Sequence, residues 1–209
     1  MAYTPIEEWD GLKVFNFKPV GNIKQTITER FVWVGKIYNN RLTHSFELPR
    51  LRFQFDYEQS SYDEREAIKT FFLDRKGKYE PFLCRTFKCD LNVKEDVPTG
   101  AVEIKITNQM FKMLYVHNVV DLYVYMEGFQ QLYKVVGVIV GSDPVTFETY
   151  EVLQLDRPIN ETMPIKTGDK LELVFKARFD TDVLSFKHYD IDISTCSLSI
   201  MTVKDYGEL

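Results

Sequence analysis

The sequence has 209 residues, of which 44% are hydrophobic and 14% aromatic, so it can bury a sizeable core in one large domain or two small ones. This composition excludes a chain that is disordered over most of its length. Acidic residues outnumber basic ones by 31 to 26 and give a formal net charge of -5, which argues against a protein whose main work is wrapping nucleic acid. The 16 Phe and 12 Tyr residues favour strands with half-buried faces.

The start of the chain has no basic stretch followed by an apolar run, so we expect no secretory signal. No apolar run approaches the roughly 18 residues that cross a bilayer, which predicts a soluble protein that is made in the cytoplasm without membrane insertion. The three cysteines, Cys84, Cys89 and Cys196, are an odd number and suggest no disulfide framework. We expect them to be small buried apolar side chains.

Apolar and polar residues alternate with period two through most of the chain, which predicts strands with one buried face. In chain order, the expected strands cover residues 14–17, 31–37, 51–57, 102–106, 122–126, 132–140, 150–155, 171–176 and 198–203. Turn-forming residues such as Pro98-Thr99-Gly100 separate them. The fold class is therefore predicted to be mainly β.

One segment between these strands has helical periodicity instead. A capping box begins at Ser61, and apolar residues recur at helical spacing as far as Phe71 and Phe72. Gly77 supplies a left-handed stop. The pattern predicts one helix over about residues 62–75, whose aromatic face packs on a sheet.

Residues 92–167 differ from their flanks in being a run of short strands and turns. We interpret them as a small β-subdomain that is inserted into, or appended to, a core formed by residues 1–91 and 168–209.

Motifs that carry chemistry are missing. The three histidines, His44, His117 and His188, lie far apart and have no metal-binding spacing. The sequence contains no nucleophile elbow, P-loop or dinucleotide fingerprint. We therefore predict that the protein is not an enzyme and has no catalytic, cofactor-binding or metal-binding residue.

Three other hypotheses stay open on the residues alone. The aspartates Asp180, Asp182, Asp190 and Asp192 could supply oxygen ligands to calcium, although acidic residues at strand ends are commonly solvated turns. Exposed aromatic residues such as Trp9 or Trp33 could bind a glycan. A pair of carboxylates could hydrolyse a polysaccharide.

Charge is distributed unevenly along the chain. Basic residues gather in the first 90 positions, and aspartates gather in the last 30; the basic ones are Arg41, Arg50, Arg52, Arg75, Lys76, Lys78 and Arg85. Opposite polarity of this kind would suit head-to-tail contact between copies of the chain, and two solvated faces are an equal alternative.

Four segments in order carry a resemblance to a known family: residues 29–31, residues 52–55, the helix end and its exit over residues 71–82, and residues 177–182. Together they resemble the distal tail, or minor tail, proteins of bacteriophages and gene transfer agents. The motif residues are Phe71, Phe72, Arg75, Gly77, Tyr79, Phe82, Arg178, Phe179, Asp180 and Asp182. We expect Phe71 and Phe72 to anchor the helix, and Tyr79 and Phe82 to begin the next strand.

The resemblance implies a structural protein of the virion tail with a tail-tube-like β-sandwich and one flanking helix. Such proteins form a ring, usually a hexamer, that connects the tail tube to the distal hub or baseplate. The implied partners are copies of the chain itself, the tail tube protein and hub proteins, with DNA only as cargo passing through the channel. A tube, adaptor or tail-completion role, or a β-sandwich glycan-binding module, remains an alternative.

Overall fold

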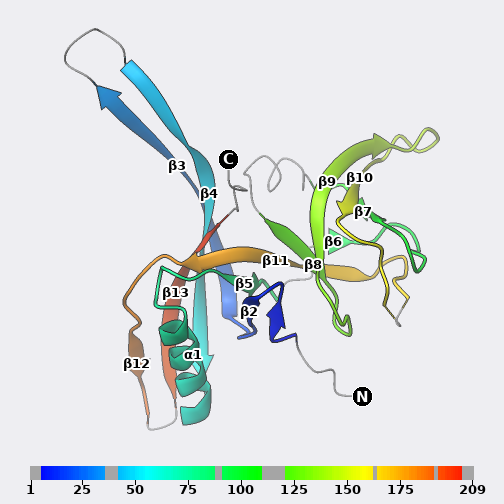
Figure 1. The fold of residues 1–209 in the computed structure, drawn as a ribbon. Coiled ribbons are helices and arrows are strands. Elements are labelled where there is room, and N and C mark those ends of the chain that lie inside the picture. Colours follow the sequence, from blue (N-terminus) through cyan, green and yellow to red (C-terminus); the bar gives the residue numbers. More distant parts are fainter. Residues whose placement is uncertain are drawn as a thin grey trace.

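The computed structural model describes residues 6–35, 42–87, 91–109, 121–161, 164–190 and 193–203, and of residues 21–35 and 42–51 it describes the backbone. These residues form a mainly β protein with one helix, built on a strongly curled mixed sheet that has the shape of a half-barrel (Figure 1). The prediction of a mainly β fold is confirmed.

The elements follow one another in chain order. They are β1 (Glu8–Trp9), β2 (Leu12–Phe15), β3 (Val20–Gly35), β4 (Leu42–Gln59), α1 (Tyr62–Asp74), β5 (Phe82–Arg85), β6 (Leu91–Asn92), β7 (Glu103–Thr107), β8 (Leu122–Tyr125), β9 (Tyr133–Ser142), β10 (Thr149–Leu155), β11 (Lys170–Phe179), β12 (Phe186–His188) and β13 (Ser194–Thr202). Strands β2 and β5 pair in parallel, and the other strand pairs in the described residues are antiparallel.

Strand β11 lies at the centre of the sheet. It pairs with β5 and β6 along one edge and with β8 and β13 along the other. Both of its faces are covered, because Glu172 and Lys176 are buried together with the apolar residues that alternate with them. The sequence predicts a strand over residues 171–176 with one face exposed to solvent. The strand is confirmed, but the prediction of a solvent-exposed face is wrong.

The buried carboxylate of Glu172 is neutralised by Arg85 of β5. Arg85 donates from Nε to Oε1 at 3.1 Å and from Nη2 to Oε2 at 2.8 Å, and the backbone N–H of Phe87 also donates to Oε1 at 2.8 Å. The guanidinium carbon lies 4.3 Å from the centre of the Phe87 ring and 4.5 Å from that of Tyr125. A bidentate pair enclosed by two aromatic rings satisfies the charge that β11 carries into the core.

The helix α1 begins close to where the sequence predicts it. Ser61 is the N-cap, and its Oγ accepts from the N–H of Glu64 at 3.2 Å. The Glu64 carboxylate accepts from the N–H of Ser60 at 2.8 Å. In a capping box the donor would be the N–H of the N-cap residue, Ser61. Ile68 and Phe72 are buried against the sheet, which confirms the predicted packing of the helix.

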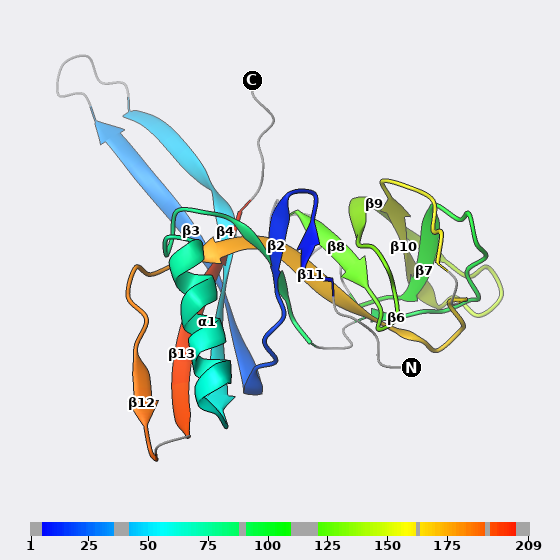
Figure 2. The same ribbon diagram turned by 60° about the horizontal axis from the view of Figure 1, so that its bottom comes forward.

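Strands β3 and β4 extend far beyond the rest of the sheet. β13 pairs with β4 only from Arg52 to Gln59, whereas β3 and β4 continue to pair as far as Gly35 and Leu42. We call residues 27–35 and 42–51 the arm. Figures 1 and 2 show the arm projecting from the body as a two-stranded ribbon. The sequence predicted strands over 31–37 and 51–57 but not this continuous hairpin; residues 36 and 37 lie outside the described part.

Strands β8, β9, β10 and β7 extend the sheet beyond β11 in that order. Near their base, the segments before β7 and before β11 lie side by side, joined by the bridge between Val97 and Ile165. Asp96 accepts there from the N–H of Thr167 at 2.8 Å and from Lys166 Nζ at 3.1 Å. The N–H of Thr167, followed by the contacts of Lys166 and the Thr167 hydroxyl, lowers the pKa of Asp96 to about 2.

Replacing Glu172 by Gln should leave the Arg85 charge unpaired in the core. We expect the free energy of unfolding to fall by about 3 kcal/mol in urea denaturation, because breaking a buried pair leaves an uncompensated charge. The control is Glu8→Gln, which breaks the exposed pair with Lys13 and should cause no measurable change. Equal effects of the two substitutions would contradict this account of β11.

Asp96 should titrate well below an ordinary aspartate. Its folded pKa of about 2 is lower than the unfolded value of about 4, so its contribution to stability is complete above pH 4 and is lost as the pH falls towards 2. Carboxyl carbon NMR should give a midpoint near 2 for Asp96, and Asp96→Asn should remove this part of the acid dependence. A midpoint near 4 would contradict the contact with the 166–167 turn.

Candidate functional site

The exit of α1 is a tight left-handed turn. The N–H of Gly77 donates to the carbonyl of Phe72 at 3.2 Å, and the N–H of Lys76 donates to that of Leu73 at 2.9 Å. These bonds form a Schellman motif, in which Lys76 is the first left-handed residue, with φ 49°, and Gly77 follows with φ 59°. The sequence placed the stop at Gly77, one residue too late.

Gly77 is required for a second reason, which is the close approach of residues 181 and 182. A Cβ at this position would lie 2.9 Å from Oδ1 of Asp182 and 3.2 Å from its Cα. Asp182 also accepts from the Lys78 N–H at 3.3 Å, and it forms an ion pair of 2.6 Å with the Lys78 ammonium. This contact lowers the pKa of Asp182 and raises that of Lys78.

The two motif segments, about 100 residues apart in sequence, therefore meet. Phe179 is fully buried, and its ring centre lies 4.8 Å from that of Phe72 and 4.6 Å from that of Phe82. Phe71 lies 5.3 Å from Phe82 and 6.3 Å from Phe179, in both cases edge to face. We call Phe71, Phe72, Phe82 and Phe179 the motif cluster. Phe15 of β2 packs against it.

The aspartates of the second motif segment bind cations of the protein rather than one another. Asp180 forms an ion pair of 2.7 Å with Nε of Arg52 on β4, and Asp182 pairs with Lys78 as described. Asp192 lies outside the described residues, and within them no group of three or more His, Cys, Asp or Glu side chains could hold a metal ion. The structure gives the calcium hypothesis no support.

Three of the predicted motif residues, Tyr79, Arg75 and Arg178, are not part of the motif cluster. Tyr79 is 73% exposed and precedes β5, so the prediction that it begins the strand is wrong, whereas Phe82 does begin it. Arg75 pairs with Glu80 at 3.5 Å within the turn. Arg178 pairs with Met201 in the β11–β13 ladder.

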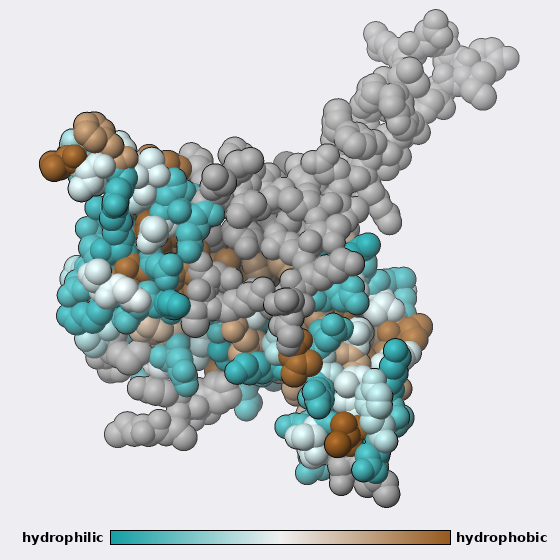
Figure 3. All heavy atoms as spheres, turned by 180° about the vertical axis from the view of Figure 1, so that it is seen from behind, coloured by the Kyte–Doolittle hydropathy of each residue, from teal (hydrophilic) through white to brown (hydrophobic). Residues whose placement is uncertain are grey.

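An open groove of about 600 Å³ borders the motif cluster. It belongs to the part of the molecule that Figure 3 shows from behind at the lower right. It lies between α1 and the segment over residues 182–188, which ends with β12. Apolar and charged side chains both line it; they are Arg65, Glu66, Lys69, Phe72, Leu73, Asp182, Val183, Leu184, Phe186 and His188. Leu73 and Val183 are 61% and 69% exposed, so apolar side chains remain uncovered here.

The structure does not bring together the histidines and cysteines whose side chains it describes. His188 is exposed and lies 3.4 Å from Arg65, His117 lies outside the described residues, and of His44 only the backbone is described. Cys84 and Cys196 are buried as predicted, and burial raises the pKa of both thiols, that of Cys196 to about 11. Cys89 lies outside the described part.

Of the two tryptophans considered for a glycan platform, the structure describes the side chain of Trp9. Trp9 is only half-exposed, packs against the core and has Arg157 over its ring at 5.3 Å. The side chain of Trp33 is among those left undescribed.

The uneven charge of the sequence is largely neutralised within the chain. Arg52 pairs with Asp180 and Lys78 pairs with Asp182, so basic residues of the first half meet acidic residues of the last thirty. Arg85 pairs with Glu172. These contacts weaken the argument from charge for head-to-tail contact between copies.

No helix in the described part of the chain is long and apolar enough to cross a membrane. The sequence matches no protein-family model, and it has no significant match among curated proteins.

Replacing Gly77 by Ala should separate the two motif segments. Both the positive φ and the contact with Asp182 oppose a side chain here, so we expect a loss of about 2 to 4 kcal/mol in the free energy of unfolding. Gly100→Ala is the matched control, because Gly100 has a φ of 88° and open space around its Cα. It should lose only about 1 kcal/mol. Equal losses would show that the contact with residues 181–182 contributes nothing.

Proposed function

We propose that this protein is a structural component of a phage tail that forms a homo-oligomeric ring, in the manner of the distal tail proteins that it resembles. The ring would connect the tail tube to the distal hub or baseplate, around the channel through which DNA passes. The proposal includes a tail-tube-like β-sandwich with α1 on its flank and a β-subdomain over residues 92–167. No catalytic step is part of it.

The observation that carries this proposal is the arm. Along it, β3 and β4 pair with each other and with no other strand of the described residues. A two-stranded ribbon is marginally stable on its own in water and needs another surface to cover it. The arm therefore calls for a partner outside the single chain.

The sequence of the arm also supports an interaction with another chain. Phe31 pairs with Phe46 and Trp33 pairs with His44 in the ladder, and paired residues share one face of an antiparallel ribbon. Residues 31–34 read Phe-Val-Trp-Val, so both faces receive apolar residues. Long apolar ribbons with free edges pair or pack with other chains.

A second uncovered surface lies at the other end of β4. The groove beside α1 has exposed Leu73 and Val183, and the edge strand β12 pairs only with β13 in the described residues. Figures 1 and 2 show the arm leaving the body at the end of β4 that is remote from α1. A projecting surface and a different receiving surface on one chain produce heterologous contacts, which close into rings when the rotation allows.

The meeting of the two motif segments supports the resemblance itself. The two segments are short and far apart in the sequence, yet Phe72, Phe82 and Phe179 form one packed cluster. Because α1, β5 and β11 join there, the motif has a common structural purpose: it fixes α1, and with it the groove, on the sheet.

Replacing Phe31 and Trp33 by Asp should prevent assembly. We expect the wild-type chain to sediment as an oligomer in analytical ultracentrifugation and the double variant to sediment as a monomer, because two charges would have to be buried in the contact. Far-UV circular dichroism at low temperature should give the same spectrum for both chains, since the arm lies outside the body of the sheet. The midpoint of thermal unfolding should fall, because assembly stabilises the folded wild-type chain.

Phe147→Asp is the control, because it places a charge at an aromatic residue that is 81% exposed in the turn between β9 and β10. Figure 1 shows that hairpin on the opposite side of the molecule from the arm. It should leave the oligomer intact. A wild-type chain that is monomeric at every concentration, or a double variant that assembles normally, would contradict the proposal.

A further inference from the structure

The turn between β9 and β10 carries apolar side chains at its tip. Val145 and Phe147 are 82% and 81% exposed, and Pro144 beside them is also exposed. Figure 1 shows the turn at the outer end of its hairpin, and Figure 3 shows hydrophobic side chains gathered at the same tip at the upper left. The core lies at the other end of the hairpin, around Leu153 and Val138, so the tip residues do not fill it.

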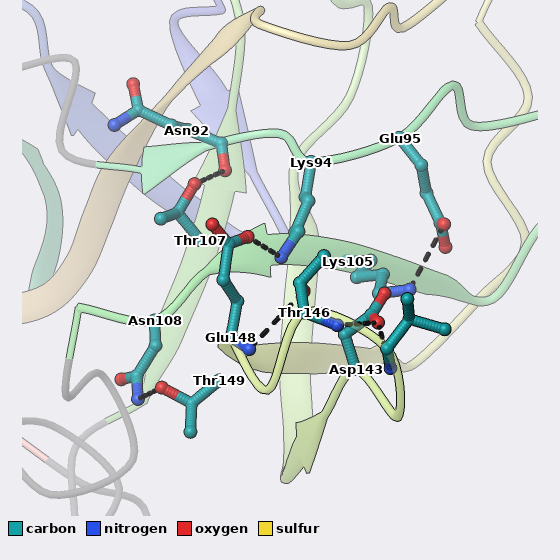
Figure 4. Close-up of polar contacts among 11 residues, drawn as sticks. Asn92, Lys94, Glu95, Lys105, Thr107, Asn108, Asp143, Thr146, Glu148 and Thr149 are labelled. Carbon is teal, nitrogen blue, oxygen red and sulfur yellow. Dashed lines mark hydrogen bonds and ion pairs between the residues drawn. The ribbon is translucent and has the colours of Figure 1, made fainter.

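The backbone of this turn makes its hydrogen bonds within the turn itself. The carboxylate of Asp143 accepts from the N–H groups of Val145 at 2.8 Å and Thr146 at 2.9 Å, and Figure 4 shows it turned into the loop. The N–H of Phe147 donates to the carbonyl of Asp143, and the N–H of Asp143 donates to that of Glu148, both at 2.9 Å. The N–H of Thr146, followed by that of Val145, lowers the pKa of Asp143. The carboxylate therefore stays ionised and bonded to the turn at neutral pH.

The remaining two positions of the turn also leave no free backbone donor. Pro144 has no N–H, and the N–H of Glu148 donates to the hydroxyl of Thr146 at 3.4 Å. Every backbone N–H over residues 143–148 is therefore absent or bonded within the turn. Moving an unbonded peptide group out of water into an apolar phase is costly, and lipid offers it no partner. This tip can leave water without losing a hydrogen bond from any backbone donor.

Phe147 occupies a backbone conformation that aromatic residues rarely adopt. Its φ is 58°, in the left-handed region that glycine or asparagine normally occupies. The side chain adds nothing to the core from this position, because it is largely exposed. Strained residues persist where the surrounding structure fixes them, and they cluster at sites that bind something. An exposed aromatic residue held in this conformation therefore indicates a contact outside the chain.

The charges near the tip are paired. Lys94 binds Glu148 at 3.0 Å, and Lys105 binds Glu95 at 3.2 Å (Figure 4). Among these described side chains, no ammonium group is left to attract an anionic surface. The Asp143 carboxylate adds a negative charge, which anionic lipids would repel. A surface of zwitterionic lipids, which has no net charge, fits these groups better than an anionic one.

We propose that this tip inserts shallowly into a surface of zwitterionic lipids, with Val145 and Phe147 among the upper parts of the acyl chains and Asp143 at the level of the headgroups. A convex tip with apolar side chains and internally bonded donors matches a deformable apolar phase, whereas a protein partner would need a preformed pocket of the same shape. Such contact is peripheral and needs no spanning segment. It does not depend on the ring proposed above, because the tip and the arm share no residue.

Two inserted side chains give weak binding for a single copy. Burial of one valine and one phenylalanine corresponds to a dissociation constant on the order of millimolar. Several tips carried by one assembly would bind the same surface together and gain avidity without any new contact. The experiments therefore use lipid at millimolar concentration, at which a single copy also binds.

The first test is flotation of the full chain with vesicles of phosphatidylcholine. We expect the wild-type chain to float with these vesicles and to gain nothing from added phosphatidylglycerol. The double variant Val145→Asp and Phe147→Asp should reduce the bound fraction by about tenfold or more, because two charges would enter the apolar phase. Aspartate tolerates the left-handed conformation at residue 147, so the turn should still form. Tyr189→Asp is the matched control, since Tyr189 is 71% exposed in the turn between β12 and β13, and it should float like the wild type.

The second test measures insertion itself, by the fluorescence of Phe147→Trp with vesicles of brominated phosphatidylcholine. Relative to the wild-type chain, the added emission should shift to the blue and be quenched by the bromine atoms. Tyr189→Trp is the control, and its added emission should stay as it is in water. Adding Phe31→Asp and Trp33→Asp to Phe147→Trp should abolish the oligomer and keep the quenching, which separates this proposal from that of the ring.

Several results would overturn the proposal. They are a wild-type chain that stays in the soluble fraction at every lipid concentration, a Val145 and Phe147 double variant that floats as well as the wild type, and a Phe147→Trp variant whose added emission is not quenched. Binding that requires anionic lipid would overturn it too. So would a protein partner that binds this turn while phosphatidylcholine vesicles do not.

Discussion

The structure depends on the burial of β11 along both edges and over both faces. A strand in that position cannot expose a charge, so Glu172 requires Arg85, and the guanidinium in turn requires the rings of Phe87 and Tyr125. The pair fixes β5 against β11. Because α1 is joined to β5 by the short turn at Gly77, it also limits where the helix can lie. The motif cluster is completed when the last residue of β11, Phe179, reaches Phe72 and Phe82.

From this centre the sheet extends in two directions. One side continues through β8 and β9 to the turn that holds Phe147 out in solvent, and the other continues through β13 to β4 and the arm. Both extensions end in apolar residues that the core does not need. Natural monomers rarely leave a long apolar ribbon uncovered without a use, which is why we assign assembly to the arm.

The helix and its packing could be predicted from the sequence, because capping and periodicity are local signals. The burial of both faces of β11 could not be predicted, because alternation of apolar and polar residues indicates one buried face and gives no information on whether the polar face is also covered. The arm was missed because Pro49 interrupts the pattern of β4. The ladder skips this residue, pairing Thr28 with Arg50 and then Arg30 with Glu47, and proline is tolerated at such irregularities. The pairings of Asp180 and Asp182 depend on contacts between distant segments. So does the groove beside α1, whose residues come from the helix and from the segment over residues 182–188.

Our main proposal is that copies of the chain assemble into a ring at the end of a phage tail. Electron microscopy tests it directly, on the purified chain and on particles produced from the genome that encodes it and labelled with an antibody to the chain. We expect rings with a central opening in the first sample and label at the distal end of the tail in the second. Single small particles without an opening, together with tails that carry no label, would contradict it.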